Sequence, residues 1–91
     1  MNKEIYTFIW QYETISTNQQ YQGDCADIVF INNGNTTVTI NGVTLQNGDG
    51  MSDNAFGNEY SNTNYNILFG GGLNPSLVIK KKIYLSTKIF K

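Results

Sequence analysis

The sequence contains no histidine, no arginine and a single cysteine, and these absences remove the commonest catalytic designs. Without imidazole there is no histidine general base, no Ser-His or Cys-His pair and no histidine ligand for a metal ion. Cys25 has no histidine to activate it as a nucleophile and no second cysteine with which to form an internal disulfide. We expect Cys25 to be a buried or half-buried hydrophobic side chain in a fold that needs no covalent cross-link.

Charged residues are also few, at 14% of the chain, and long apolar runs are absent. No stretch approaches the roughly 20 apolar residues of a membrane-spanning helix. The first apolar run is short and is interrupted by Thr7, which does not fit a secretory signal. These features predict a soluble protein that is made in the cytoplasm. The low charge also suits a protein that packs against other subunits in an assembly.

Carboxylates and glycines supply the remaining candidate chemistries, and neither set forms a recognisable site. Asp49, Asp53 and Glu59 are close in sequence, but they fall in a polar loop that departs from the calcium-binding EF-hand pattern at Met51. The run Gly70–Gly72 lacks the known phosphate-binding motifs and is not followed by a helical pattern. We therefore predict a non-enzymatic protein with no catalytic residues, no cofactor and no metal site.

What the chain does contain is β-strand patterning, most clearly between Asp27 and Leu45. Asn41-Gly42 supplies the two positive φ angles of a type I′ turn and predicts a tight hairpin. The continuous apolar run Ile28–Ile31 predicts a central strand that is covered on both faces. Residues 36–40 alternate apolar side chains with threonines, which predicts a strand with one buried face and a threonine ladder on the other.

The N-terminal segment Glu4–Ser16 alternates aromatic with other residues over its whole length, which predicts a strand. One side carries only aromatic residues, and we expect it to face the core. The members of this side are Tyr6, Phe8, Trp10 and Tyr12. The alternative is a platform on which sugars stack.

The rest of the chain divides into two polar segments and two further strands. Thr17–Asp24 is interpreted as a linker, and Gln46–Asn64 as a long loop with few apolar residues. Tyr65–Phe69 predicts a short strand, and Ser76–Phe90 predicts a long one. Lys81 falls on the apolar side of the long strand, which indicates either a β-bulge near it or an inward-pointing charge that protects a sheet edge.

The charges are segregated along the chain, because every acidic residue precedes residue 60 while five lysines occupy the last twelve positions. Lysine suits long-range attraction to an acidic surface on another protein. The candidate partner contacts combine residues of the lysine-bearing strand face with the large side chains of the long loop. They are Lys80, Lys82, Tyr84, Lys88, Met51, Phe56 and Tyr60.

Together these patterns predict an all-β chain: a small antiparallel β-sandwich or barrel-like domain with β-hairpins, formed by residues 1–91 as a single domain. Two function classes remain as alternatives to an assembly role. One is a carbohydrate-binding or adhesin-type module that uses the aromatic residues. The other is a nucleic-acid binder that uses the C-terminal lysines, although the chain is acidic overall and lacks arginine.

The segment FINNGNTTVTINGVTL, at residues 30–45, resembles strand-Asn-Gly-strand text in small all-β virion proteins of tailed phages, particularly crAss-like and related phages of Bacteroidetes hosts. The resemblance covers about twenty residues and the Asn-, Thr- and Gly-rich composition. It implies a virion structural protein, such as an auxiliary or decoration capsid protein, that is assembled in the host cytoplasm. Its partners would be major capsid, neck or tail subunits in a homo- or hetero-oligomeric assembly. The resemblance implies no active-site residues.

Overall fold

The described part of the protein folds into β-strands and connecting turns. The computed structural model describes the backbone of residues 3–55 and 59–90. It describes the side chains of residues 7–55 and 59–85. The strands are β1 Lys3–Ile15, β2 Gln19–Gln22, β3 Asp27–Asn32, β4 Val38–Ile40, β5 Val43–Leu45, β6 Gly50–Asn54, β7 Asn64–Phe69 and β8 Leu77–Phe90. Among residues 3–55 and 59–90 there is no helix with the length and apolar character needed to span a membrane.

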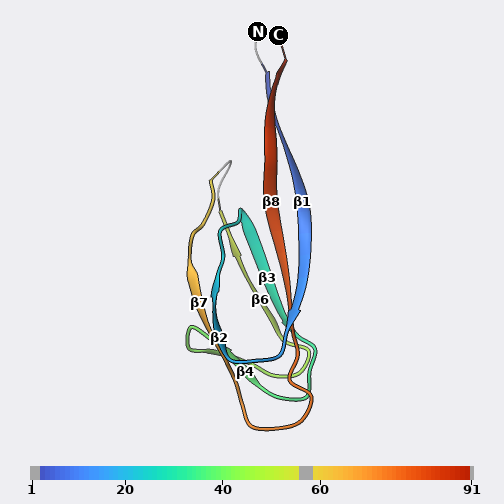
Figure 1. The fold of residues 1–91 in the computed structure, drawn as a ribbon, viewed down its shortest axis with the longest axis vertical. Coiled ribbons are helices and arrows are strands. Elements are labelled where there is room, and N and C mark those ends of the chain that lie inside the picture. Colours follow the sequence, from blue (N-terminus) through green and yellow to red (C-terminus); the bar gives the residue numbers. More distant parts are fainter. Residues whose placement is uncertain (1–2, 56–58, 91) are drawn as a thin grey trace.

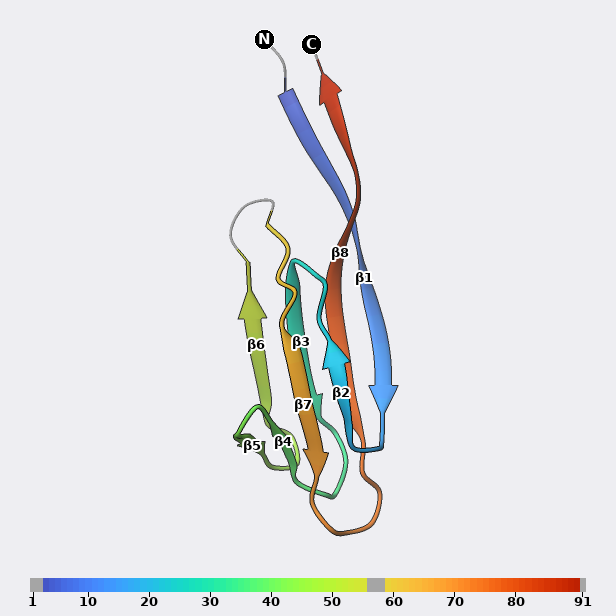
Figure 2. The ribbon, with the colours of Figure 1, turned by 60° about the vertical axis from the view of Figure 1, so that its left-hand side comes forward.

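Two antiparallel four-stranded sheets pack face to face (Figures 1 and 2). Sheet A has the order β1-β8-β3-β6, and sheet B has the order β2-β7-β4-β5. Because the two sheets stay separate, the sandwich that the sequence predicted is confirmed in preference to a closed barrel.

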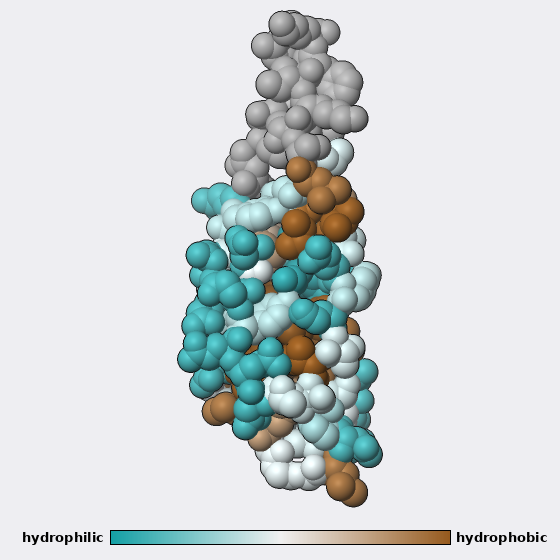
Figure 3. All heavy atoms as spheres, viewed as in Figure 1, coloured by the Kyte–Doolittle hydropathy of each residue, from teal (hydrophilic) through white to brown (hydrophobic). Residues whose placement is uncertain are grey.

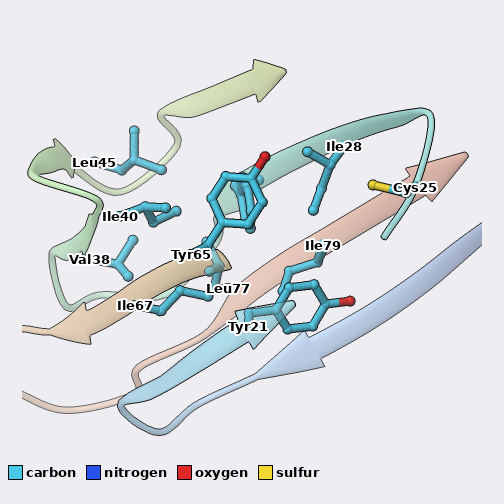
Figure 4. Packing of buried hydrophobic residues seen from close by; sticks show 11 residues of the cluster. Tyr21, Cys25, Ile28, Val38, Ile40, Leu45, Tyr65, Ile67, Leu77 and Ile79 are labelled. Atoms are coloured by element: carbon cyan, nitrogen blue, oxygen red, sulfur yellow. The ribbon is translucent and has the colours of Figure 1, made fainter. Parts of the chain in front are cut away.

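The core lies between the sheets and is built by alternation along the strands. Sheet A contributes the inward-facing residues of β3 and β8, and sheet B contributes those of β2, β4, β5 and β7 (Figure 4). The buried cluster consists of Tyr21, Cys25, Ile28, Phe30, Val38, Ile40, Leu45, Tyr65, Ile67, Leu77 and Ile79. Cys25 is 1% exposed, so the prediction that it is a buried hydrophobic side chain is confirmed.

The predicted Asn-Gly hairpin is present between β4 and β5. Asn41 has φ 47° and Gly42 has φ 88°, as a type I′ turn requires. Val38 and Ile40 point into the core, while the hydroxyls of Thr39 and Thr44 lie 3.3 Å apart on the outer face. The alternation predicted for this strand is therefore also confirmed.

The prediction for Ile28–Ile31 is half right. β3 is central, since it pairs with β8 on one side and with β6 on the other. However, only one of its faces is covered: Ile28 and Phe30 are buried, Val29 is partly buried and Ile31 is exposed. A sandwich has two layers, so the outer face of a central strand has no third layer to cover it.

Both polar segments contain strands that the sequence did not indicate. In Thr17–Asp24, β2 pairs with β7 and is anchored by the buried Tyr21. In Gln46–Asn64, β6 pairs with β3, and Met51 is its apolar residue packed against the core. Each strand has one apolar anchor and is held mainly by backbone pairing, which leaves no periodic signal to detect.

The prediction that the aromatic side of β1 faces the core is wrong. Phe8, Trp10 and Tyr12 pair with Tyr84, Lys82 and Lys80, which alternate with the buried residues of β8. The aromatic rings therefore lie on the outer face of sheet A. Period-two alternation places side chains on a common side, but the partner strand decides which side faces inward. Tyr6 has its side chain outside the described residues.

Lys81 is an inward-pointing charge, one of the two arrangements that the sequence allowed. Its Nζ lies 4.9 Å from the ring centroid of Tyr21. Burial by itself would lower the pKa of Lys81, but interactions with Tyr21 and with Glu13 outweigh it and raise that pKa above its ordinary value. The bulge is elsewhere, at Leu85, where the β1–β8 register passes from Ser86 to Tyr84. Because β8 is an internal strand here, Lys81 does not protect an edge.

The molecule is elongated, with extents of 57 × 18 × 18 Å. Pairing of β8 with β3 ends at Lys82, whereas pairing with β1 continues to Phe90. The last part of the β1–β8 pair therefore projects beyond the sandwich as a two-stranded ribbon, with the start of β1 and the end of β8 side by side (Figures 1 and 2).

The opposite end of the sandwich is held by the fully buried side chain of Asn32. Its Nδ2 donates to the carbonyls of Thr36 and Leu45, each at 2.9 Å, and its Oδ1 accepts from the amide of Gly34 at 3.0 Å. Gly34 itself has no room for a side chain, because a Cβ there would lie 2.4 Å from the carbonyl oxygen of Asn74. Asn32 thus connects the end of a sheet A strand to the hairpin of sheet B.

We expect Asn32→Ala to lower the free energy of unfolding by about 3 kcal/mol or more, because it removes three buried hydrogen bonds at once. Chemical denaturation followed by circular dichroism measures this loss. Asn33→Ala is the matched control, since Asn33 is exposed and its removal should change stability by less than about 0.5 kcal/mol. Equal effects of the two substitutions would contradict the structural role of Asn32.

Candidate functional site

The outer face of sheet A carries a row of aromatic and lysine side chains, which we call the aromatic–lysine strip. Its members are Phe8, Trp10 and Tyr12 of β1 and Lys80, Lys82 and Tyr84 of β8. Phe8, Trp10 and Tyr12 are 44%, 38% and 67% exposed. The strip forms because both strands alternate in phase at this point, so that rings on one strand lie opposite lysines on the other.

The two lysines lean along the strip and cover neighbouring rings. Lys80 Nζ lies 4.4 Å from the ring centroid of Trp10 and 5.8 Å from that of Tyr12. Lys82 Nζ lies 4.4 Å from the ring centroid of Phe8 and 5.5 Å from that of Tyr84. Phe8 and Trp10 also meet edge to face, with centroids 6.0 Å apart. These cation–π contacts order the lysine side chains on a surface that remains open to solvent.

Tyr60, from the connection between β6 and β7, extends the strip. Its ring stacks on that of Tyr84, with centroids 5.5 Å apart and planes 17° from parallel. Its hydroxyl donates to the carbonyl of Tyr84 at 2.9 Å and accepts a hydrogen bond from the Tyr84 amide. Beyond the end of the β3 pairing, the Tyr60 hydroxyl therefore bonds the amide and carbonyl of Tyr84, which a neighbouring strand would otherwise bond.

Four of the seven predicted contact residues are brought together here: Tyr60, Lys80, Lys82 and Tyr84. Met51 is separate from them, because its partly buried side chain packs against the core. Phe56 and the side chain of Lys88 lie outside the described residues. On β3, Asp27 is the cross-strand neighbour of Lys82, so this face carries charges of both signs.

Further apolar surface lies where the ribbon leaves the sandwich. Ile9, on the inner face of β1, is 40% exposed, and Leu85, at the bulge of β8, is 61% exposed. In Figure 3, apolar side chains gather over the upper part of the β1–β8 pair, whereas hydrophilic residues cover the side that carries β7. Beyond the end of sheet B, the β1–β8 pair therefore presents apolar side chains on both of its faces.

Two of the acidic residues in the segment predicted to be a long loop, Asp49 and Asp53, have hydrogen-bond partners. Asp53 accepts a hydrogen bond from the Tyr65 hydroxyl at 2.7 Å, and Asp49 accepts one from the Gln46 amide at 2.9 Å. Burial raises the pKa of the Cys25 thiol, which further disfavours the reactive thiolate. In the part of the chain that the structure describes, no group of three or more Cys, Asp or Glu residues is arranged to hold a metal ion.

Comparisons of the chain with protein-family models, with curated proteins and with solved structures found no match. The fold and the surface of the chain itself are therefore the basis for any functional argument.

Sequence reasoning found the lysines and the aromatic residues but did not place them on one surface. The available signal was the in-phase alternation of residues 8–12 with residues 80–84. It becomes informative only once the pairing of β1 with β8 is known, because a shift by one residue would put the rings on the opposite face.

We expect Trp10→Ala to lower the free energy of unfolding by only about 1 kcal/mol, because the ring is exposed and its loss removes mainly the contacts with Lys80 and Phe8. Phe30→Ala is the comparison, since Phe30 is fully buried and its truncation should cost about 3–5 kcal/mol. Urea denaturation of both variants measures the difference. A loss for Trp10→Ala as large as that for Phe30→Ala would place the ring in the core.

The protein should become less stable at alkaline pH. Burial, together with the hydrogen bond to Asp53, raises the pKa of Tyr65 above its ordinary 10.0, and burial raises the pKa of Cys25 above 9.0. Groups with a raised pKa in the folded state stabilise it below their unfolded pKa, and this contribution is lost as the pH rises. The free energy of unfolding should therefore be flat up to about pH 8 and decline above it.

Urea denaturation at a series of pH values measures this profile. Tyr65→Phe serves as the control, because removal of the hydroxyl should lower stability at neutral pH and make the alkaline decline shallower. Stability that increases above about pH 9 would contradict the assignment.

Proposed function

We propose that this chain is a non-enzymatic structural component of a large assembly, as the resemblance to small virion proteins of tailed phages implies. The observation that carries the proposal is the apolar surface on both faces of the β1–β8 pair, near the point where the pair leaves the sandwich. Phe8 and Trp10 lie on one face and Ile9 on the other, each at least 38% exposed. Exposed apolar surface of this kind marks contact with another protein.

The shape of the molecule supports the same proposal. A two-stranded ribbon is only marginally stable in water by itself and gains most from a partner that covers its faces. The chain extends 57 Å along one axis, so the ribbon reaches well beyond the core that holds it. Projecting ribbons of this form are suited to lying across a neighbouring subunit.

The proposed role is that of an auxiliary or decoration capsid protein, which stabilises contacts between neighbouring subunits. Its partners would be major capsid, neck or tail subunits, met in the cytoplasm of the host. Lys80 and Lys82 would favour an acidic patch on the partner and would contribute to the rate and orientation of docking. The exposed rings would supply most of the binding energy.

Location of the chain in a density gradient of a source lysate, by peptide mass spectrometry, tests the proposal directly. We expect the chain to migrate with large particles at a fixed ratio to their main subunit. Recovery only among soluble proteins would overturn the assembly role.

A pair of leucine variants tests the surface. Leu85→Asp should reduce the particle-associated fraction of the chain at least several-fold, because it places a charge on the apolar surface where the ribbon leaves the sandwich. Leu73→Asp is the matched control, since Leu73 is 81% exposed in the β7–β8 connection and far from the ribbon. Equal incorporation of both variants would remove the ribbon from the contact.

Carbohydrate binding is a second candidate, favoured by the exposure of Trp10 and Tyr12 on one flat sheet face. Aromatic rings exposed on a β-sheet can stack against the apolar faces of sugars. A glycan array probed with the purified chain, followed by the Trp10→Ala variant, distinguishes this role. Binding that is lost in the variant while the fold is retained would support the carbohydrate role over the assembly role.

A further inference from the structure

The edges of the two sheets differ sharply in how open they are to another strand. Three of the four edge strands are short: β6 has five residues, β2 has four and β5 has three. The β3-facing side of β8 is blocked by the Tyr60 hydroxyl, which bonds the amide and the carbonyl of Tyr84. The remaining edge strand, β1, has 13 residues. Short edges and blocked edges are the usual protection against unwanted pairing, and β1 has neither.

The backbone groups that β1 leaves open can be assigned from the pairing of β8. The amide of Ala26 donates to the carbonyl of Lys82, so the even-numbered residues of this part of β8 direct their backbone groups toward β3. The odd-numbered residues then face β1, where they pair with Ile9, Gln11 and Glu13. By the same alternation, the amides and carbonyls of Phe8, Trp10, Tyr12 and Thr14 point away from the sheet.

Most of the devices that discourage pairing are missing from this edge, and the one inward-pointing charge, Glu13, interacts with Lys81 of the same chain. Residues 8–15 contain no proline, no lysine and no glycine, and the bulge of the β1–β8 pair lies on β8. Proline, lysine and bulges are the devices that natural proteins place on exposed edges. Three of the four residues whose backbone groups point away from the sheet, Phe8, Trp10 and Tyr12, also carry the exposed aromatic rings.

We infer that β1 pairs antiparallel with β1 of a second copy of this chain, with Trp10 on the twofold axis. In this register Trp10 lies opposite the partner's Trp10, and Phe8 lies opposite the partner's Tyr12. All exposed rings of the edge are thereby matched with rings, and cross-strand aromatic pairs are among the most favourable in antiparallel sheets. The two sheets A join into one continuous sheet with both aromatic–lysine strips on the same face.

Charge and register favour a second copy over an unrelated strand. On the inner face, Glu13 lies opposite the partner's Thr7 and Ile9 lies opposite the partner's Gln11, so no like charges meet. A register centred on Tyr12 would keep only the match of Tyr12 with the partner's Tyr12, and would place Trp10 opposite the partner's Thr14 and Phe8 opposite the partner's Ser16. The pairing is isologous and closes on itself, as twofold symmetry requires. The inference rests on the proposed function only in one respect: it treats this dimer as the unit that is incorporated into the large assembly.

Sedimentation equilibrium of the purified chain tests the inference with two variants of one residue. Tyr12→Pro removes an amide that points away from β8, so it should leave the β1–β8 pairing intact and block the edge. Tyr12→Thr removes the ring but keeps the amide. We expect a dimer for the wild type, a weaker dimer for Tyr12→Thr and a folded monomer for Tyr12→Pro. A wild-type monomer at every concentration, or a dimer for Tyr12→Pro, would overturn the inference.

Oxidative cross-linking tests the register without depending on the proline variant. Opposite residues in a hydrogen-bonded antiparallel pair have Cα atoms about 5.5 Å apart, which a disulfide can span. Trp10→Cys should therefore give a disulfide-linked dimer, whereas Phe8→Cys, which faces the partner's Tyr12, should give at least several-fold less. Cys25 is buried and does not compete. Equal cross-linking of the two variants would exclude a pairing centred on Trp10.

The failure of this inference is distinguishable from the failure of the proposed function. A monomeric chain that migrates with particles would refute the β1 pairing and leave the assembly role in place. A dimer that is never found with particles would refute the assembly role and leave the β1 pairing in place.

Discussion

The buried amide of Asn32 is the interaction on which the arrangement of the two sheets depends. A side-chain amide offers two donors and one acceptor group, and here it meets the carbonyls of Thr36 and Leu45 and the amide of Gly34. The backbone of Asn32 adds bonds to the carbonyl of Asp49 and to the amide of Gly48. Because Asn32, Gly34, Thr36 and Leu45 are all buried, the side-chain part of this network is stabilising only when it is complete. The network holds the end of β3 against the β4–β5 hairpin at one end of the sandwich.

The other end of the sandwich is governed by where sheet B stops. Along the inner face of β8, buried Leu77 and Ile79 are followed by Lys81, which is held between Tyr21 and Glu13, and then by Ile83. Lys81 thus marks the boundary at which the inner face leaves the closed core. Beyond it the strands continue without a covering layer, and apolar residues that would lie in a core elsewhere are exposed. The fixed end positions the exposed end, which is the part of the molecule available to a partner.

The sequence was most informative where a feature depends on neighbouring residues alone. The Asn41-Gly42 turn follows from the φ angles that these two residues tolerate, and the buried face of β4 follows from strict alternation. The strands β2 and β6 could not be predicted, because each has a single apolar anchor and is held by pairing with a distant strand. The direction in which the β1 rings face required knowledge of β8, from which β1 is separated by some sixty residues of chain. The sequence therefore showed the aromatic and lysine residues of the strip, but it did not show that they share one surface.

The outward placement of the β1 rings also decides which groups the outer face of sheet A presents. The polar side chains of Asn32, Asp49 and Asp53, by contrast, are each occupied in holding the backbone or the Tyr65 hydroxyl. Within the described residues, the outer face of sheet A presents rings and lysines, and β1 at its side is the edge that we infer to pair with a second copy. Such groups bind by area, by stacking and by backbone pairing, which are the interactions of one protein surface with another.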